Sequence, residues 1–394
     1  MKKQIAIIGG GPSAFLLAAF LDAEKFNITI YEKNKTTGRK FLVAGKGGFN
    51  LTHSESIQQL ITRYSPNEFL EQALLHFTNT DFIKWLDSIG IPTYIGSSNR
   101  VYPKKGIKPI EVLTSILKHL EDKGVIIKYN HTFSGWNEAN APIINDKATQ
   151  GYYTVFSLGG GSWKVTGSDG KWLDTFSKKG IKIKAFEASN CSYHINWKPV
   201  FIKNHEGEPL KNIAISCDNI VQKGEAVITK FGLEGNAIYA LSPQIRKQLN
   251  TTSRATISID FKPLLSLKQL HFKIKTSKYR NTTEILKKEL KLSPCQIDLL
   301  KTYLSKEAYL NTESLSKYIK KFILIITQTA TVDEAISTVG GIELDAVSAH
   351  FELAALPNQF CIGEMLNWDA PTGGYLLQAC ASIGVYLARH LNEK

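Results

Sequence analysis

The chain has 394 residues, of which 43% are apolar and 21% are charged, and its formal net charge is +13. At roughly 150 residues per domain this length predicts two to three globular domains, and the composition excludes a disordered, collagen-like or coiled-coil chain. The five cysteines include no C-x-x-C pair, so we expect no disulfide framework and no metal site. This cysteine pattern predicts a protein of the reducing cytoplasm. No apolar run approaches the roughly 20 residues of a membrane helix, so we expect no membrane association.

Residues 1–190 are expected to form a domain of alternating strands and helices. A short apolar strand at 4–8 leads through glycines into an apolar helix at 15–21 and a second strand at 27–31, which together form a βαβ unit. Further helices and extended segments are expected at residues 68–86, 110–123, 125–129 and 152–158. The alternation of expected strands and helices along the chain predicts an α/β fold with a mainly parallel sheet.

The middle of the chain has a different character. Residues 191–263 contain short strand-like runs separated by turn residues, which predicts a β-rich inserted domain, whereas residues 264–321 are helical. Residues 322–337 are expected to return to the β-rich domain as a strand. Residues 338–394 bring back glycine motifs and a final helix, so we expect them to complete the first domain.

A glycine motif lies between the first strand and the first helix. It has the form Gly9-x-Gly11-x-x-Ala14, and Glu32 ends the second strand. Gly9 permits a tight turn, Gly11 lets a pyrophosphate approach the backbone, and Ala14 lets helix and strand pack closely. The helix N-terminus offers N–H groups to the anion, and Glu32 can accept hydrogen bonds from a ribose hydroxyl. The pattern predicts a dinucleotide site, but this loop alone does not decide between FAD and NAD.

The glycine motifs at the end of the chain favour FAD, because flavoproteins bring a second loop to the flavin end of an extended FAD. The ordered motifs lie at residues 38–40, 45–52, 158–163, 166–170, 209–213, 229, 232–235, 338–341, 363–364 and 371–375. With these motifs the chain resembles the bacterial NAD(P)/FAD-dependent oxidoreductases described as BaiN-like, YhiN-like or aminoacetone oxidase-like flavoproteins, in a divergent branch. The resemblance implies a Rossmann-type FAD-binding domain made from both chain ends, with an inserted β-barrel-like domain and a small helical domain.

The resemblance also implies which residues surround the FAD. These are Gly9, Gly11, Pro12, Ser13 and Ala14 at the pyrophosphate; Glu32 at the ribose; Arg39 and Lys40 beside the phosphates; Gly45, Lys46, Gly47, Gly48 and Asn50 along the isoalloxazine and ribityl; Phe133 near the adenine; Lys33, Gly159 and Gly160 at the cofactor; Gly363 and Glu364 by the ribityl or phosphate; and Gly373, Gly374, Tyr375 and Leu376 at the pyrimidine edge of the flavin.

These observations predict a cytoplasmic FAD-dependent oxidoreductase that acts on an unidentified small molecule, with the flavin carrying the redox chemistry. No catalytic acid or base stands out in the sequence. Lys46 is the best candidate, since a cation in a glycine loop near the flavin can polarise a substrate. Only one G-x-G-x-x-A unit is visible, so NADH or NADPH would reduce the flavin as a transient visitor.

Two alternatives stay open. Residues 262–321 contain 14 Lys or Arg against 5 Asp or Glu, an excess that would suit a flavoenzyme docking on nucleic acid. The lysines are scattered and have few interleaved arginines or aromatic residues, so we favour a solvated helical face for this segment. The second alternative is an FAD-binding sensor without turnover, which the lack of an evident catalytic residue permits.

Overall fold

The computed structural model describes residues 1–43, 49–96, 98–149 and 151–394. The chain divides into two compact units. Unit 1 contains Met1–Ser189 and Val332–Lys394, so it is built from both ends of the chain, and unit 2 contains Asn190–Thr331. Among the described helices, none combines the length and the apolar character needed to cross a bilayer.

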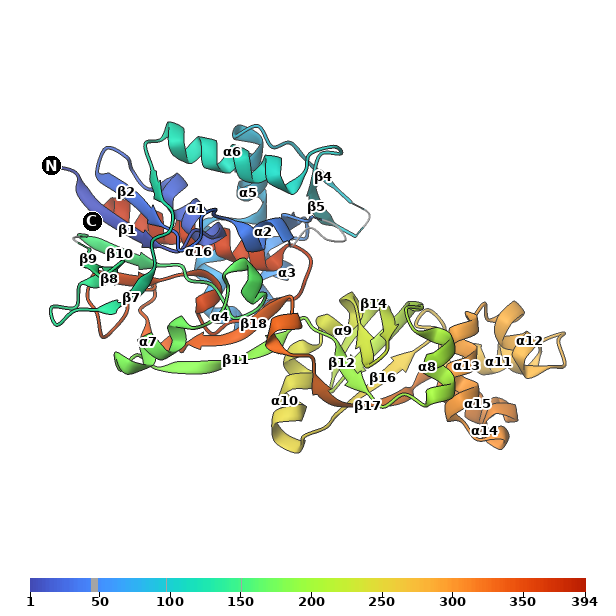
Figure 1. The fold of residues 1–394 in the computed structure, drawn as a ribbon. Coiled ribbons are helices and arrows are strands. Elements are labelled where there is room, and N and C mark those ends of the chain that lie inside the picture. The colour runs from blue at the N-terminus through green and yellow to red at the C-terminus, as the bar shows by residue number, and fades with distance from the viewer. Residues whose placement is uncertain (44–48, 97, 150) are drawn as a thin grey trace. The chain divides into compact units, whose positions relative to one another are not determined.

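A five-stranded parallel sheet forms the centre of unit 1 (Figure 1). Its strands, in spatial order, are β19 (Gln359–Cys361), β10 (Tyr153–Phe156), β1 (Lys3–Ile8), β2 (Phe26–Tyr31) and β6 (Ile126–Lys128). Residues 5–8 of β1 are all buried, as is typical of a central parallel strand that is covered on both faces. Neighbouring strands pair in parallel throughout, which confirms the expected α/β fold and places the carboxyl ends of β1, β2 and β10 at one edge.

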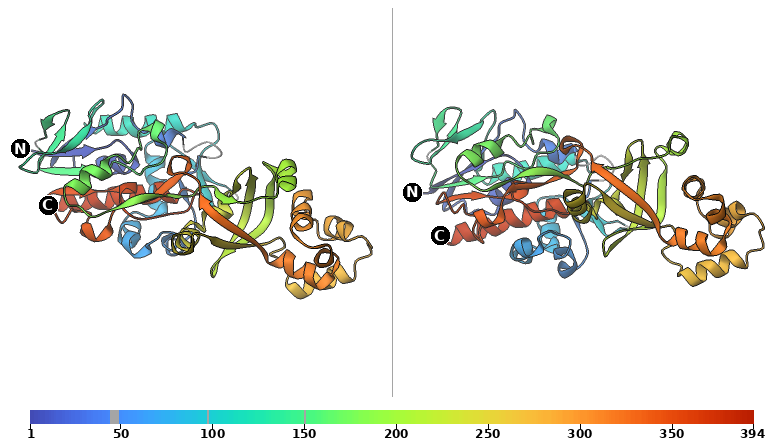
Figure 2. Two further views of the ribbon diagram at one scale, coloured as in Figure 1. Left: turned by 60° about the horizontal axis from the view of Figure 1, so that its bottom comes forward. Right: turned by 90° about the horizontal axis from the view of Figure 1, so that it is seen from below.

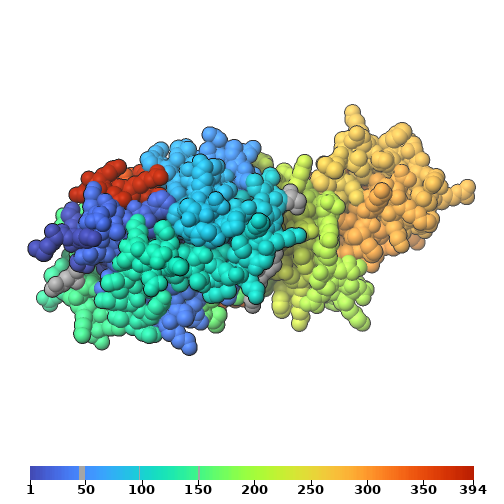
Figure 3. Space-filling model, turned by 90° about the horizontal axis from the view of Figure 1, so that it is seen from above, coloured from blue at the N-terminus to red at the C-terminus, as the bar shows by residue number. Residues whose placement is uncertain are grey.

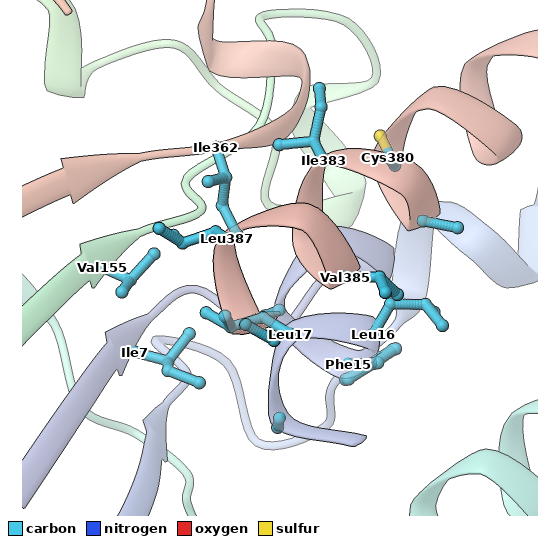
Figure 4. Close-up of a cluster of buried hydrophobic side chains, with 14 of the residues drawn as sticks. Ile7, Phe15, Leu16, Leu17, Val155, Ile362, Cys380, Ile383, Val385 and Leu387 are labelled. Atoms are coloured by element: carbon cyan, nitrogen blue, oxygen red, sulfur yellow. The ribbon is translucent and has the colours of Figure 1, made fainter. Parts of the chain in front are cut away.

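Two helices pack on this sheet and on each other. They are α1 (Pro12–Phe20) and α16 (Tyr375–Glu393), which come from opposite ends of the chain. Leu17 of α1 and Leu387 of α16 lie near Ile7 of β1 and Val155 of β10, and Leu16 lies beside Val385 of α16 (Figure 4). The helices can approach closely because residue 384 is a glycine: a Cβ at this position would lie 2.5 Å from the Ser13 carbonyl oxygen, which is too close. The C-terminal helix therefore holds the start of α1 in place.

Shorter elements complete unit 1. The helices are α2 (Arg39–Val43), α3 (Ile57–Ile61), α4 (Asn67–His76), α5 (Asn79–Ser88), α6 (Pro109–Asp122) and α7 (Trp172–Lys178), with 3₁₀ turns η1 (Lys164–Thr166), η3 (Val332–Glu334), η4 (Leu344–Ala346) and η5 (Gly363–Met365). The small antiparallel sheets are β3 (Thr52–His53) with β5 (Arg100–Pro103) and β4 (Thr93–Ile95); β7 (Phe133–Trp136) with β8 (Pro142–Ile144) and β9 (Lys147–Ala148); and β11 (Ile183–Ser189) with β18 (Ser337–Ile342). Side chains of the segment that carries α5 and α6 cover one face of this unit (cyan in Figure 3).

Unit 2 contains a closed six-stranded barrel, whose curved strands are visible in Figure 2. The strands follow each other around the barrel as β12 (Tyr193–Ile195), β15 (Gly232–Glu234), β14 (Ile220–Thr229), β13 (Pro209–Cys217), β16 (Ala255–Asp260) and β17 (Phe322–Thr329). Pairing of β17 with β12 closes the ring. Helices α8 (Pro199–His205), α9 (Asn236–Tyr239) and α10 (Ser242–Thr252) connect strands of the barrel.

A helical segment is inserted between β16 and β17. It contains α11 (Leu267–Lys275), α12 (Thr282–Glu284), the π-helix η2 (Ile285–Glu289), α13 (Pro294–Tyr303), α14 (Lys306–Leu310) and α15 (Thr312–Lys320). Ser266 and Ser293 begin α11 and α13, and each accepts a hydrogen bond from a glutamine N–H three residues later in a capping box. The expected fold class, a Rossmann-type domain with an inserted barrel, is thus confirmed. The expected β-rich domain (residues 191–263 and 322–337) and helical domain (264–321) remain our proposal for a finer division, although residues 332–337 lie in unit 1.

One sequence expectation about the helices was wrong. The single helix expected at residues 68–86 is two helices, α4 and α5. The break has a local cause, because Thr78 caps α5: its hydroxyl accepts from the Asp81 N–H, and the Asp81 carboxylate accepts from the Thr78 N–H in return. This reciprocal pairing begins a new helix at the polar run of residues 78–81, which separates the two apolar stretches.

Candidate functional site

The turn between β1 and α1 contains three glycines with different surroundings. Gly9 has φ +103°, and a Cβ there would lie 2.3 Å from the Ser157 carbonyl oxygen. A Cβ at Gly10 would lie 2.0 Å from the Thr37 hydroxyl oxygen, whereas a Cβ at Gly11 would meet nothing within 4 Å. The first two glycines are therefore required by packing within the protein, and Gly11 faces open space in front of the N-terminus of α1.

Glu32 lies beside this turn at the end of β2. Its side chain is buried, and its Oε2 accepts a hydrogen bond of 3.0 Å from the Gly10 N–H. Oε1 accepts from the backbone N–H and the side-chain amide of Asn34, at 2.8 and 2.7 Å. The carboxylate is thus fixed in position at the sheet edge, and its remaining lone pairs can accept hydrogen bonds from a ligand.

Ser13 occupies the first turn of α1. Ser13 is only 2% exposed, and its hydroxyl oxygen makes no hydrogen bond of normal geometry with any described residue. It interacts with the Cys380 thiol, which is only a weak hydrogen-bonding group. Burial raises the pKa of this thiol to about 12, so Cys380 is neutral and competes only weakly with an anion for the serine hydroxyl. An orphaned buried hydroxyl at a helix N-terminus is typical of an anion site.

These groups open into a cavity of about 480 Å³ that lies within unit 1. Phe133 on β7, the Gly159 backbone and the indole of Trp172 also line the cavity, and Trp172 Nε1–H donates to the Gly159 carbonyl at 3.0 Å. Gly363 and Glu364 of η5 form another part of the wall. The lining therefore combines the glycine turn with aromatic side chains, which suits a ligand that has both an anionic group and a planar ring.

Charged side chains around the cavity are mostly paired with one another. Lys40 Nζ donates to both carboxylate oxygens of Glu364, at 3.0 and 2.8 Å, and Lys33 Nζ lies 3.1 Å from the Asp169 carboxylate. Arg39 instead donates to the amide oxygen of Asn34 and to a backbone carbonyl. Among the described residues Arg39 has no carboxylate partner, so its positive charge is available to an anionic ligand.

The structure brings many of the expected site residues together. Those that line the cavity are Gly9, Gly11, Pro12, Ser13, Glu32, Lys33, Arg39, Lys40, Phe133, Gly159, Gly363 and Glu364. Ala14 and Gly160 stand behind it: Ala14 is fully buried, and a Cβ at Gly160 would lie 2.2 Å from the Thr338 hydroxyl oxygen and 2.9 Å from the Glu364 carboxyl carbon. Asn50, Gly373, Gly374, Tyr375 and Leu376 are not among its lining residues. Gly45, Lys46, Gly47 and Gly48 lie outside the described residues.

Some residues of the site were not expected from the sequence. Gly10, Asn34 and Trp172 line the cavity, and Thr37 supports the turn by donating to the Gly10 carbonyl at 2.7 Å. Gly10 could have been found from the uninterrupted Gly9-Gly10-Gly11 run, since two consecutive glycines beyond the turn residue suggest a second close approach. The other three have no signal in the sequence, because their roles depend on segments that meet only in the fold.

Tyr375, at the start of α16, belongs to a separate polar cluster. Its hydroxyl donates to Glu55 at 2.6 Å, and Arg63 donates to both carboxylate oxygens of Glu55, at 3.2 and 2.9 Å. Burial alone would raise the pKa of Glu55, but the hydrogen bonds from Arg63 and Tyr375 outweigh it and hold the pKa below 4.5. His53 stacks on the Tyr375 ring at 5.1 Å, and burial lowers its pKa, which favours a neutral imidazole.

Gly374 begins α16 with φ +97°, and a Cβ there would lie 2.6 Å from the Thr52 Cα. The helix N-terminus is therefore held against β3 by a contact that only glycine allows.

Comparison with known families gives one match that spans the chain. The model of the HI0933-like protein Rossmann domain matches residues 3–390. The 3-dehydro-bile acid delta(4,6)-reductase of Clostridium scindens is 23% identical over 416 aligned residues that cover 100% of both chains. A ribosomal RNA dihydrouridine synthase of Haemophilus influenzae is 31% identical over 110 residues, which cover 28% of this chain and 27% of that protein.

Comparison with solved structures shows a similar fold in the 3-ketosteroid-delta4-(5alpha)-dehydrogenase of Rhodococcus jostii. Its TM-score is 0.51 at 12% identity, with coverage of 100% of this chain and 97% of that one. At this identity the similarity concerns the fold alone.

Proposed function

The chain belongs to the HI0933-like family, and from this premise we propose that it is an FAD-dependent oxidoreductase whose FAD occupies the cavity of unit 1. The observation that carries the proposal is the cradle at the start of α1. There Gly11 faces open space, the buried Ser13 hydroxyl lacks a strong partner, and Glu32 is fixed beside the turn. A pyrophosphate would complete the hydrogen bonding of this helix start.

The residues around the cavity fit the remaining parts of FAD. Glu32 would accept hydrogen bonds from the adenosine ribose, and the pocket at Phe133 and Trp172 would hold the adenine ring. Arg39 would add positive charge near the phosphates, where Lys40 is already balanced by Glu364. The other residues expected from the sequence, Gly45–Gly48, Asn50 and Gly373–Leu376, remain proposed for the flavin end, and Lys46 remains the proposed polarising cation.

Bound FAD would supply hydride chemistry, and we propose that the substrate carries a carbon–carbon double bond conjugated to a carbonyl. The support comes from two relatives: one is named as a delta(4,6)-reductase of a 3-dehydro-bile acid, and the other as a synthase of dihydrouridine, which is uridine with its conjugated ring double bond reduced. The relative that covers the full length of the chain acts on a small molecule, so we propose a small-molecule enone as the substrate class and NADH or NADPH as the electron source.

Anaerobic reoxidation of the reduced protein tests this reaction class. The protein is first titrated with NADH and NADPH without air, and then mixed with a conjugated cyclic enone or with its saturated ketone as the control. We expect the oxidised flavin spectrum to return with the enone and one saturated product to form per flavin, whereas the saturated ketone gives no reoxidation. A flavin that stays reduced with a broad panel of enones would contradict the reaction class. A flavin that neither reductant can reduce would favour the sensor alternative.

An RNA substrate is the second candidate, and it rests on the helical insertion of unit 2. The excess of basic residues over 262–321 is largely solvent-exposed, at Lys268, Lys273, Lys275, Lys278, Arg280, Lys287, Lys288, Lys291, Lys301, Lys306, Lys317 and Lys321. The partial similarity to a dihydrouridine synthase gives this candidate its chemistry. We expect only nonspecific RNA affinity, about 10⁻⁴ to 10⁻⁶ M at physiological salt. Nanomolar binding to a structured ribosomal RNA fragment, weakened by charge-reversal variants of the insertion, would make RNA the first candidate.

A further inference from the structure

A cluster of side chains that could hold a metal ion lies in unit 2, next to the motif at residues 209–213. His205 ends α8, Glu208 precedes β13, and Cys295 stands in the first turn of α13. One ligand atom from each residue, an imidazole nitrogen, a carboxylate oxygen and the thiol sulfur, lies within 4.8 Å of the other two. The three residues come from two distant stretches of the sequence, so their meeting is a product of the fold.

The imidazole of His205 is oriented from its other side. Its Nε2 lies 3.1 Å from an Asp298 carboxylate oxygen, a distance at which Nε2–H donates to the carboxylate. That pairing leaves Nδ1 with a lone pair. Nδ1 is buried and makes no hydrogen bond of normal geometry, although a Glu208 carboxylate oxygen lies 3.3 Å away. The residue is only 5% exposed, so water does not easily satisfy this nitrogen.

The arrangement places two electron-pair donors against each other. A neutral Nδ1 and an ionised carboxylate both accept hydrogen bonds and neither donates one, so their approach to 3.3 Å is unfavourable unless a proton or a cation lies between them. Cys295 faces the same space and is fully buried. Burial and the carboxylates of Glu208 and Asp298 raise the pKa of its thiol to about 12, so a metal ion has to displace the thiol proton when it binds. A carboxylate that holds a histidine ring for coordination is a common feature of metal sites, and Asp298 has this position.

We propose that His205 Nδ1, Glu208 and Cys295 Sγ bind one divalent transition-metal ion of the zinc class, with water as the fourth ligand. Zinc takes nitrogen and oxygen ligands at about 2.0–2.2 Å and sulfur at about 2.3 Å, so ligand atoms on a tetrahedron lie about 3.3–3.8 Å apart. The cluster needs only small movements to reach these separations, and the half-exposed Glu208 side chain is free to make them. On binding, the sulfur–metal bond replaces the sulfur–hydrogen bond and the proton leaves to solvent.

The site has a structural consequence within unit 2. Its ligands join the segment between α8 and β13, which belongs to the barrel connections, to the start of α13 in the helical insertion. A metal ion would thereby cross-link the barrel to the insertion. It would stabilise the folded unit in proportion to its occupancy, because the unfolded chain does not bring these ligands together.

The test uses the full-length protein, freed of metal by chelator and then titrated with Co²⁺ and Zn²⁺. We expect one Co²⁺ per chain, with a thiolate-to-cobalt charge-transfer band and tetrahedral ligand-field bands at wavelengths longer than oxidised flavin absorbs. Zn²⁺ is expected to displace Co²⁺ and to raise the Tm. Cys295→Ser should remove the charge-transfer band, and Glu208→Gln, a substitution at a half-exposed side chain that leaves the core intact, should weaken Zn²⁺ binding at least 10-fold.

Two further variants separate coordination from folding. Cys217→Ala changes another buried cysteine of unit 2 that is not a proposed ligand, so it should leave the cobalt spectrum and the affinity for Zn²⁺ unchanged. Asp298→Asn should weaken Zn²⁺ binding about 10- to 100-fold, as expected for a residue that orients a ligand. The proposal is overturned if the wild-type protein shows no cobalt–thiolate band, or if Glu208→Gln binds Zn²⁺ as tightly as the wild type. Either result would mean that His205 and Glu208 form a proton-mediated pair.

Discussion

Adjacent glycines of the β1–α1 turn should respond in opposite ways to the same methyl group. A Cβ at Gly11 meets nothing within 4 Å, and the backbone there, φ −112° and ψ 179°, suits any residue. A Cβ at Gly10 would lie 2.0 Å from the Thr37 hydroxyl oxygen and would displace the hydrogen bond from that hydroxyl to the Gly10 carbonyl. Gly10→Ala should therefore damage the fold, whereas Gly11→Ala should damage only the FAD site.

The magnitudes follow from these contacts. Gly10→Ala should lower the free energy of unfolding of the flavin-free protein by about 1–3 kcal/mol, the usual cost of overpacking, which corresponds to a Tm lower by about 2–4 °C for each kcal/mol. Gly11→Ala should leave that free energy within about 0.5 kcal/mol of the wild type. Gly11→Asp would bring a carboxylate to about 4 Å from a phosphate charge, which costs about 4 kcal/mol near a protein surface, or about 1000-fold in the Kd of FAD.

The assay combines two measurements on each variant. Thermal unfolding of the flavin-free proteins gives the stability, and titration with FAD, followed by flavin fluorescence, gives the Kd. We expect Gly10→Ala to have the lowest Tm and Gly11→Asp to have a wild-type Tm with a Kd raised about 1000-fold. Full FAD affinity in Gly11→Asp would refute the placement of the pyrophosphate in front of α1. An unchanged Tm in Gly10→Ala would refute the packing role assigned to that glycine.

Three further predictions concern the charged pair at the cavity, the acid response and the start of α16. Lys40→Gln should raise the Kd of FAD about 10- to 100-fold, because the negative charge of Glu364 then lies beside the phosphates without a cation to balance it. Glu364→Gln should raise the Kd less, or lower it, and equal changes in Kd for the two variants would contradict this electrostatic account. The pKa of Glu55 is lower in the folded chain than its ordinary value of 4.5, so its ionised form stabilises the fold above pH 4.5, and this stabilisation is lost as the pH falls through the folded pKa. The free energy of unfolding, measured in urea at pH 7 and pH 3, should therefore depend less on pH in Glu55→Gln than in the wild type. An equal pH dependence would disprove this stabilising role of Glu55. Gly374→Ala should lower the Tm more than Gly180→Ala. Both positions have positive φ, but only a Cβ at residue 374 would clash with the β3 backbone. Equal Tm changes would show that the close contact between Gly374 and β3 is not needed for stability.

The sequence predicted those parts of the fold and of the site whose positions depend on residues that are close together in the sequence. Gly9, Gly11 and Glu32 lie at fixed distances along one βαβ unit, so the spacing of the residues translates directly into their positions at the sheet edge. The buried character of β1 and α1 could be inferred in the same way, since both segments are apolar over nearly their whole length. The parallel sheet followed from the alternation of strands and helices.

Contacts between distant segments could not be predicted from local patterns. Lys40 was expected to supply positive charge, but Glu364, more than 300 residues later, neutralises it through two hydrogen bonds. Such features depend on which side chains the folded chain brings together, and spacing in the sequence does not encode that.

The mass of the intact wild-type protein, measured under native conditions after purification without added flavin, tests the central claim most directly. We expect each chain to carry the mass of one noncovalent FAD, released on denaturation and identified as FAD by its fragmentation. Protein that carries no flavin and does not take up FAD on titration, or that carries FMN in its place, would contradict the assignment of the cavity in unit 1 as an FAD site.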